Sequence, residues 1–256
     1  MAKLYFRYGT MDSAKTLNLL AVAHNYRKQG KRVVLAKPAL DDRFGDRRVA
    51  SRAGLSDDAD LLLEPGTVLE LEALRGVDCV LVDEAQFLSP AVIDQLRLVT
   101  LWLDLPVICY GLRTDFQTRG FPGSLRLMEV ADSIEEVKVT CQQCGRKAVF
   151  NLRIADGAAV IEGDQVSLGD EEYVPVCGHH YFEQIGARGL SILGISVPSE
   201  GPSESPSESP SESPVESPVE SPVESPVESP VKSSVESPAG GSSEDDPRGE
   251  RSDATG

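Results

Sequence analysis

Two short runs of this chain are almost wholly apolar, and they restrict its possible folds more than any other feature. They span residues 77–82 (VDCVLV) and 106–110 (PVICY). Shorter runs of the same kind lie at Lys3–Tyr8 and Arg32–Ala36. Strands that are apolar on both faces are typical of parallel sheets covered by helices on each side. The sequence therefore predicts an α/β domain built on a parallel sheet.

Helical patterns fill the gaps between these strands, as such a sheet requires. One helix is expected at Thr16–Gln29, with Gly30 placed to end it. A second is expected at about Ser89–Leu101, because serine caps a helix N-terminus well and proline fits the first turn. A third pattern covers Val68–Leu74. The residues expected to share one face of the first helix are Leu17, Leu20, Ala21 and His24.

The C-terminal part of the chain has the composition of a segment that does not fold. Residues 197–256 hold 11 of the 17 prolines, no aromatic residue, and a net charge of −11 out of the total −16. Between Ser203 and Pro238 they repeat Ser-Glu-Ser-Pro and then Val-Glu-Ser-Pro. We expect a disordered, solvated tail, with phosphorylation of its Ser-Pro pairs as the less favoured role. The acidic balance of the chain also argues against binding to nucleic acid or to a membrane through bulk charge.

A phosphate-binding loop is predicted directly after the first strand. Residues 9–16 (GTMDSAKT) match the pattern G-x-x-x-x-G-K-[ST] except at position 14, where alanine replaces the second glycine. In such a loop the backbone N–H groups and the helix N-terminus bind phosphate, the lysine reaches the outer phosphates, and the threonine hydroxyl binds Mg²⁺. Alanine is strained at position 14 if its φ is positive. A plain strand-to-helix turn that happens to contain Lys-Thr is the simpler alternative. The predicted ATP-binding residues are Gly9, Thr10, Met11, Asp12, Ser13, Ala14, Lys15 and Thr16.

Two carboxylates, Asp83 and Glu84, follow the apolar strand at 77–82. P-loop enzymes keep the acid of their Mg²⁺ site at the end of such a strand. A general base beside it would deprotonate a hydroxyl that attacks the γ-phosphate. Exposed acids that merely follow a strand are the alternative interpretation. Because both motifs lie at strand C-terminal ends, where α/β sheets bind ligands, together they favour phosphoryl transfer from a nucleoside triphosphate.

A third motif has the spacing of a zinc site. A Cys-x₂-Cys pair at 141–144 is followed by Cys-x₂-His at 177–180, which is a strong signal in a chain without a secretory pattern. His179 competes for the fourth position but breaks the two-residue spacing. Four protein ligands would close the site, so the zinc would be structural. The segment between the pairs, rich in glycine and acids, is a candidate lid. The expected ligands are Cys141, Cys144, Cys177 and His180.

Five sequence blocks keep a fixed order between Lys3 and Phe182. They are LYFRYGTMDSAKT at 4–16, DDRF at 41–44, DEAQF at 83–87, YGLRTDF at 110–116, and the cysteine–histidine pattern. In this order and spacing they resemble the cytosolic (type II) thymidine kinases. The resemblance does not cover the tail. It implies a RecA-like P-loop domain at 1–138, a zinc-ribbon-like lasso domain at 139–190, and a homotetramer as the usual assembly.

The resemblance also implies roles for individual residues. Glu84 would be the general base toward the 5′-hydroxyl of thymidine, Asp83 would bind Mg²⁺ through water, and Arg43 would steady the transferred phosphoryl group. Without the resemblance, the aromatic residues of these blocks fit plain core packing equally well. The residues implied to line or close the base pocket are Phe87, Leu112, Phe116, Phe121, Val166 and Tyr173.

These observations predict an ATP-dependent thymidine kinase that uses Mg²⁺ with ATP and carries structural Zn²⁺. One alternative is a kinase of another deoxynucleoside, such as deoxyuridine or deoxycytidine. The other is a non-catalytic zinc-ribbon module that binds nucleotides, in which Ala14 has disabled the loop. The intact set of Lys15, Thr16, Asp83 and Glu84 argues against that alternative, since an inactive site has no reason to keep it.

Cysteine usage and apolar segments predict a cytoplasmic protein. Cys79 and Cys109 lie inside apolar strand-like runs, and the other three cysteines cluster late in the chain, so they make a poor disulfide set. No apolar stretch approaches the ~20 residues of a membrane span. Residues 1–7 have no apolar core of the length that a signal peptide requires.

Overall fold

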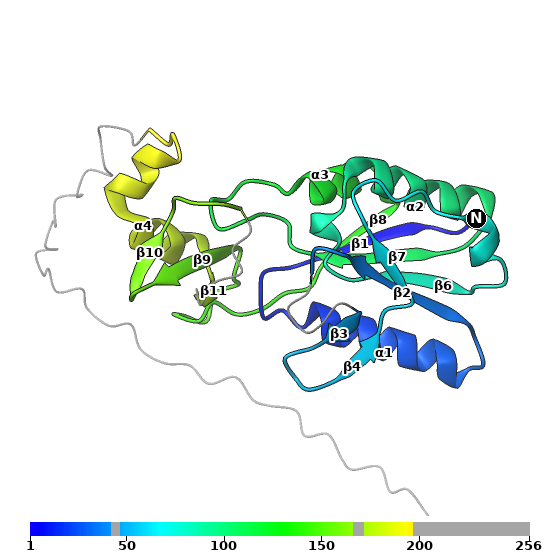
Figure 1. The fold of residues 1–256 in the computed structure, drawn as a ribbon. Helices are drawn as coiled ribbons and strands as arrows, with labels where there is room; N and C mark the ends of the chain where they lie inside the picture. Colours follow the sequence, from blue (N-terminus) through cyan, green and yellow to red (C-terminus); the bar gives the residue numbers. More distant parts are fainter. Residues whose placement is uncertain (42–46, 166–171, 197–256) are drawn as a thin grey trace, which may run out of the picture. The chain divides into compact units, whose positions relative to one another are not determined.

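A parallel sheet organises the first part of the chain in the computed structural model (Figure 1). The structure describes residues 1–41, 47–165 and 172–196. The predicted tail at 197–256 lies outside the described residues, as do Arg43 and Val166. Within the described ranges the sheet has six strands, and each pair of neighbours is parallel, as the apolar runs predict. In spatial order these are β5 (Leu61–Leu63), β2 (Val33–Pro38), β6 (Cys79–Val82), β7 (Val107–Gly111), β1 (Leu4–Tyr8) and β8 (Ser133–Glu136).

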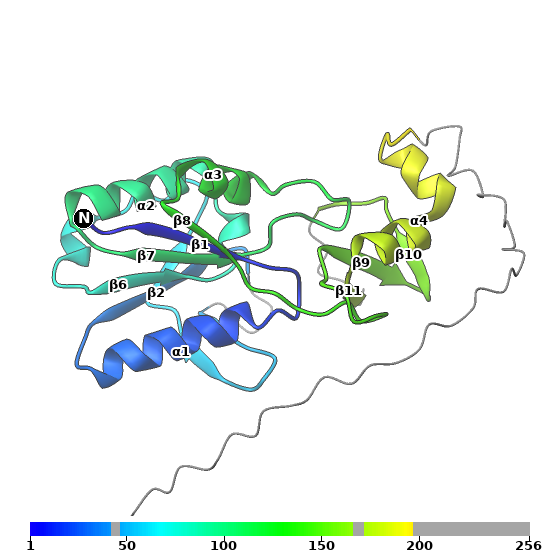
Figure 2. The ribbon, with the colours of Figure 1, turned by 180° about the vertical axis from the view of Figure 1, so that it is seen from behind.

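Helices cover both faces of this sheet (Figures 1 and 2). Helix α1 (Lys15–Lys28) packs on one face, and α2 (Pro90–Trp102) and α3 (Pro122–Val130) pack on the other. Residues of β6 alternate between the two cores: Val80 and Val82 pack with α2, whereas Leu81 packs with α1. Because side chains alternate along a strand, a strand buried on both sides must be apolar at every position.

Helix α1 buries a different face from the one that its sequence pattern predicts. Leu19, Leu20 and Ala23 are buried, whereas Ala21 and His24 are exposed, so the predicted face was correct for Leu20 and wrong for Ala21 and His24. The start of the helix explains the difference. Thr16 must face the end of β6, and the residues three, four and seven positions further on share its side of the helix. The end was predicted correctly: Gly30 has φ 75° and donates its N–H to the carbonyl of Arg27 at 2.9 Å.

Helix α2 begins as predicted, but the helix predicted before β6 is shorter than expected. Ser89 accepts a hydrogen bond from the N–H of Val92 at 3.4 Å, and proline takes the first helical position. The predicted helix at Val68–Leu74 was wrong over its first half, because only Leu71–Leu74 form a short 3₁₀ helix, η1. The side chain of Gln95 on α2 accepts the N–H of Leu69 at 2.7 Å, which holds that part of the chain outside a helix.

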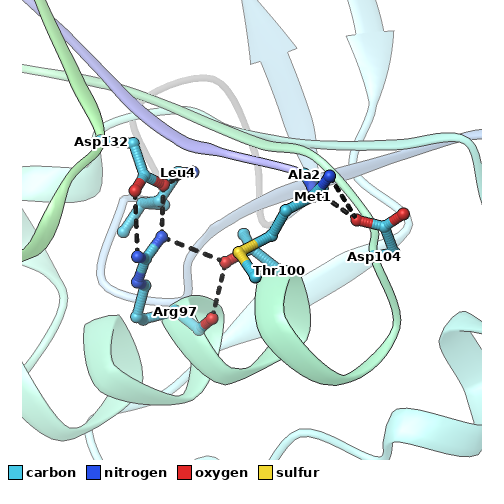
Figure 3. A network of polar contacts seen from close by, with 7 residues as sticks. All are labelled: Met1, Ala2, Leu4, Arg97, Thr100, Asp104 and Asp132. Atoms are coloured by element: carbon cyan, nitrogen blue, oxygen red, sulfur yellow. Dashed lines mark hydrogen bonds and ion pairs between the residues drawn. The ribbon is translucent and has the colours of Figure 1, made fainter.

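Polar contacts anchor the start of β1 against α2 (Figure 3). Both guanidinium NH groups of Arg97 bind the carboxylate of Asp132, one of them at 3.0 Å. Asp132 also accepts the N–H of Leu4 at 2.8 Å. The first strand, which leads into the phosphate loop, is therefore tied at its beginning to a helix on one face of the sheet.

Two smaller sheets complete the described chain. A hairpin of β3 (Arg48–Ala50) and β4 (Ser56–Asp58) follows β2. Later, β10 (Ala158–Val160), β9 (Phe150–Ala155) and β11 (Glu172–Val176) form an antiparallel sheet.

The antiparallel sheet packs against α4 (Gly178–Ile192) around a core of its own. Helix α4 was not predicted, since Gly186 interrupts its pattern and has non-helical backbone angles. Across the described ranges, each helix is too short or too polar to cross a bilayer.

Candidate active site and metal site

The loop between β1 and α1 is shaped by contacts that need its first glycine. A Cβ atom at Gly9 would collide with Ser13 Oγ and with the carbonyl oxygen of Val137. The N–H of Gly9 donates to the carbonyl of Gly111 at 3.2 Å, which fixes the loop to the end of β7. Ser13 Oγ donates to the carbonyl of Thr10 at 2.8 Å and closes the turn. The loop is thus built into the C-terminal edge of the sheet.

Ala14 has the left-handed backbone that the missing glycine would favour. Its φ and ψ are 60° and 29°, directly before α1. A left-handed conformation costs a residue with a Cβ atom roughly 1–2 kcal/mol, so this position is strained. The loop nevertheless keeps its turn with alanine.

The side chains of Lys15 and Thr16 take different directions from the start of α1. Lys15 Nζ donates to the carbonyl of Thr10 at 2.7 Å and lies 3.4 Å from Ser13 Oγ. Thr16 Oγ1 donates to Asp83 Oδ2 at 3.0 Å. Burial, with the negative charge of Glu84 adding to it, raises the pKa of Asp83. A hydroxyl and a carboxylate side by side are hard oxygen ligands that suit Mg²⁺.

Gln86 connects the second carboxylate to the loop after β7. Glu84 has φ 49° and precedes the 3₁₀ helix η2 (Ala85–Phe87). Gln86 Nε2 donates to Glu84 Oε2 at 2.5 Å, and Gln86 Oε1 accepts the N–H of Leu112 at 3.0 Å. A Cβ atom at Gly111 would stand 2.6 Å from Gln86 Oε1, so a larger residue there would displace the Gln86 side chain. Gln86 lies in the DEAQF block, but the sequence alone predicts no role for it.

A cavity of about 410 Å³ lies at this edge of the sheet, within the usual range for small-molecule sites. Phe87 and Phe121 meet edge to face in its wall, with ring centroids 5.7 Å apart. Gly9, Thr10 and Ser13 support the loop and are not among the lining residues. The predicted site residues that line the cavity are Met11, Asp12, Ala14, Lys15, Thr16, Asp83, Glu84, Phe87, Leu112, Phe116, Phe121 and Tyr173.

Several polar residues that line this cavity have no role predicted from the sequence. Asn151 Oδ1 on β9 accepts the N–H of Met11 at 2.8 Å, so the antiparallel sheet contacts the phosphate loop. Asp41 follows β2, and its Oδ2 lies 3.2 Å from Nζ of the fully buried Lys37. The lining residues that the sequence analysis did not identify as part of a site include Asp41, Gln86, Asp115, Asn151 and Gln165.

The four predicted zinc ligands converge on one point. Their ligand atoms all lie within 4.8 Å of one another. His180 Nδ1 is 3.3 Å from Cys141 Sγ and 3.5 Å from Cys177 Sγ, and Cys144 Sγ is 3.9 Å from Cys177 Sγ. Ligands of a tetrahedral zinc, with bonds of ~2.3 Å to sulfur and ~2.0 Å to nitrogen, stand about 3.5–3.8 Å apart. The cluster therefore fits a metal ion such as zinc.

The thiol of Cys141 ionises more readily than that of an ordinary cysteine. Burial opposes ionisation of Cys141, but His180 and the neighbouring backbone N–H groups outweigh it and lower the pKa of this thiol to about 6. A thiolate is the form that binds metal.

His179 does not join the cysteines: its side chain is 63% exposed, and its Nδ1 lies 3.6 Å from Glu183 Oε2. A second possible grouping, of His179, His180 and Glu183, contains no cysteine.

A family model described as thymidine kinase matches residues 2–181. The chain belongs to the thymidine kinase family. The family membership expected from the five sequence blocks is thus confirmed, and so is the α/β fold with a parallel sheet and a cysteine cluster that suits zinc.

Relatives within the thymidine kinase family cover the same part of the chain. A thymidine kinase of Lactiplantibacillus plantarum is 45% identical over 185 residues, which are 71% of this chain and 96% of that protein. One from Streptococcus pyogenes serotype M3 is 46% identical over 190 residues, 71% of this chain and 98% of that protein. The solved structure of Bacteroides Pif1 bound to ssDNA has 16% identity and a TM-score of 0.31 over 53% of this chain and 38% of its own, too weak a likeness to argue from.

Proposed function

We propose that this chain transfers the γ-phosphate of ATP to the 5′-hydroxyl of thymidine, giving dTMP. One observation carries the proposal: a single cavity is lined by Lys15 and Thr16 of the phosphate loop, by Asp83 and Glu84, and by aromatic side chains. Relatives named thymidine kinase, at 45–46% identity, support thymidine as the acceptor. The phosphate-binding end of the cavity suits the triphosphate donor, and the aromatic end suits the nucleoside acceptor. The two substrates would then react between these ends.

Glu84 is the general base of the proposed reaction, and it takes the proton of the 5′-hydroxyl. The amide of Gln86 donates to one oxygen of its carboxylate at 2.5 Å and restricts how it turns. Lys15 offsets the negative charge of the outer phosphates. Arg43, outside the described residues, keeps the phosphate-steadying role that the resemblance implies for it.

The proposed enzyme uses two metal ions, Mg²⁺ with ATP and Zn²⁺ in the cysteine–histidine site. Thr16 and Asp83 hold the Mg²⁺ that accompanies ATP, and their adjacent oxygen atoms support this role. The bound ion offsets charge on the phosphates. Zinc is structural, because its four ligands come from the protein and leave no position for a substrate. Those ligands are Cys141, Cys144, Cys177 and His180.

The nucleoside lies at the aromatic end of the cavity. Phe87 and Phe121 form one wall, and Leu112, Phe116 and Tyr173 also line the space. Flat aromatic side chains suit a pyrimidine ring, which has a π-face that can stack on them. Val166 keeps its implied place beside them and lies outside the described residues.

The decisive experiment measures phosphate transfer by the purified full chain. With ATP and Mg²⁺, we expect dTMP as product and a higher kcat/KM for thymidine than for deoxyuridine or deoxycytidine. Lys15→Met should abolish transfer, whereas Lys28→Met, an exposed lysine at the end of α1, should not change it. Preference for another nucleoside would favour the first alternative. No product with any nucleoside would favour the non-catalytic module.

The proposal also includes the domain limits, assembly and location expected from the sequence. We propose a P-loop domain at 1–138, a lasso domain at 139–190 and a homotetramer, following the resemblance to the family. A cytoplasmic location is supported by the five cysteines, none of which forms a disulfide in the described structure.

A further inference from the structure

The segment after β7 lies along the part of the chain that carries the proposed zinc ligands, here called the zinc-binding part (residues 139–190), and contacts it repeatedly. Residues 113–117 begin two positions after the end of β7, and Phe116 in this segment lines the cavity. Four of the five residues make side-chain or carbonyl hydrogen bonds to residues 149–165. These are Arg113 to the carbonyl of Val149 (3.4 Å), Asn151 to the carbonyl of Thr114 (3.4 Å), Gln165 to Asp115 (2.9 Å), and Gln117 to the carbonyl of Ile161 (2.8 Å).

Phe116 is the most enclosed residue of this segment and is held at two points. It is 1% exposed. The hydroxyl of Tyr181 donates to its carbonyl oxygen at 2.5 Å, and this contact is buried. The guanidinium carbon of Arg153, on β9, lies 4.7 Å from the centroid of its ring. Backbone and ring are thus each fixed by a residue of the zinc-binding part.

Tyr181 belongs to the same helical turn as two of the proposed zinc ligands. It follows His180 directly, and its N–H donates to the carbonyl of Cys177 at 3.0 Å. The side chain is fully buried and packs on Phe150, with ring centroids 4.9 Å apart. Any ion that fixes Cys177 and His180 therefore fixes the position of the phenol as well.

We propose that Tyr181 is a positioning residue that connects the zinc site to the nucleoside pocket by holding the carbonyl of Phe116. This inference rests on the proposed function, since it gives Phe116 a part in binding the nucleoside. Zinc binding orders the first turn of α4, the phenol then fixes the backbone of residue 116, and the ring of Phe116 keeps its place in the cavity wall.

The test is Tyr181→Phe, which removes one hydroxyl and keeps the ring that packs on Phe150. We expect zinc to stay at one ion per chain and the KM for thymidine to rise about five- to tenfold, the effect of one lost hydrogen bond. The KM for ATP and kcat should stay within about threefold. The matched control is Tyr26→Phe on α1, whose hydroxyl interacts with Cys79 on the opposite side of the sheet domain from α2 and α3.

Hydrogen exchange supplies a measurement that needs no substrate. The amides of Gln117, Thr118 and Arg119 are hydrogen-bonded to Asp115 and report on the order of this segment. In Tyr181→Phe they should exchange faster, while amides of β6 and α1 keep their protection. Removing zinc from the unmodified protein should have the same effect on the same amides, which keeps the inference testable if the variant does not fold.

Three results would overturn the inference. The first is unchanged exchange at 117–119 and an unchanged thymidine KM in a folded variant. The second is loss of zinc, or an equal rise in the KM for both substrates, because the hydroxyl would then only support the fold. The third is full protection of 117–119 after zinc removal. Absence of any kinase activity in the unmodified protein would reject the proposed function, and the exchange measurement would still decide whether Tyr181 makes this connection.

Discussion

Thr16 Oγ1 lies 3.0 Å from Asp83 Oδ2, and this hydrogen bond joins the start of α1 to the end of β6. The two residues are 67 positions apart in the sequence. The fold thereby places the phosphate loop beside Glu84, the next residue after Asp83. In the proposed reaction, the loop that binds the phosphates of ATP therefore lies next to the carboxylate that takes the proton of the acceptor hydroxyl.

Replacing Glu84 with glutamine should lower kcat by about 10²–10⁴-fold, the usual effect of removing a general base. Binding of thymidine should change little, since glutamine has nearly the same shape. Steady-state kinetics with both substrates would measure the effect. Glu72→Gln, which alters an exposed acid paired with Arg75, is the control and should keep full activity. Near-normal kcat in Glu84→Gln would eliminate Glu84 as the base.

Ala14→Gly should stabilise the protein by about 0.5–1 kcal/mol. The substitution relieves the cost of the left-handed backbone, and glycine's larger entropy in the unfolded chain cancels part of the gain. Ala21→Gly on the exposed side of α1 is a control with the opposite sign, since glycine within a helix costs roughly 1 kcal/mol relative to alanine. Denaturant unfolding compares the two. A destabilised Ala14→Gly would contradict the assignment of strain to this residue.

Removing a zinc ligand should affect the nucleoside site before the parallel sheet. Cys144→Ala is expected to lose zinc and to raise the KM for thymidine more than the KM for ATP, because metal binding at such a site contributes local folding free energy. His180→Ala should have the same two effects, loss of zinc and a selective rise in the KM for thymidine. His179→Ala should keep its zinc, as its side chain is exposed and lies toward Glu183. Metal analysis of the three variants checks this, and zinc loss in the His179 variant alone would reverse the assignment.

The ion pair between Arg97 and Asp132 should make stability depend on pH. The hydrogen bonds from Arg97 lower the pKa of Asp132 in the folded state. A lowered folded pKa means that the stabilisation is complete above the unfolded pKa of ~4 and is lost as the pH falls through the folded pKa.

Asp132→Asn should therefore cost up to about 1 kcal/mol at pH 7, a value reduced by partial exposure of the pair. The cost should shrink as the pH falls through the folded pKa of Asp132. Urea unfolding at several pH values provides the measurement. Glu64→Gln, at an exposed acid, should show no such trend. A constant difference between Asp132→Asn and the unmodified protein at all pH values would rule out this cause.

Truncation after residue 196 should leave kinase activity and Tm unchanged. The prediction rests on the composition of 197–256, which offers too little apolar area to add packing. Thermal unfolding and kinetics of the truncated and full chains would test it. A drop of several degrees in Tm would mean that the segment binds to the rest of the protein.

The sequence predicts the elements whose signal is local. β6 and β7 are unbroken apolar runs because both of their faces are buried, and α2 carries its own cap in Ser89. The phosphate loop, the paired acids and the cysteine–histidine spacing are likewise short motifs. Each can be recognised without knowing what lies opposite it in space.

Other features depend on distant neighbours and leave no such signal. Gln86 matters because its amide reaches both Glu84 and the backbone of Leu112. Asn151 matters because it meets Met11, 140 positions away. The buried face of α1 was mispredicted for the same reason, since the contact of Thr16 with Asp83 and not the apolar pattern sets the rotation of that helix.

The alternation of side chains along β6 has a consequence for how the protein unfolds. Because successive residues of one strand belong to different cores, loosening α1 from its face of the sheet removes support from the same backbone that α2 and α3 cover. We therefore expect both helical layers to melt in a single cooperative transition. The antiparallel sheet and α4 have a core of their own, so we expect them to open at lower free energy while the parallel sheet stays intact.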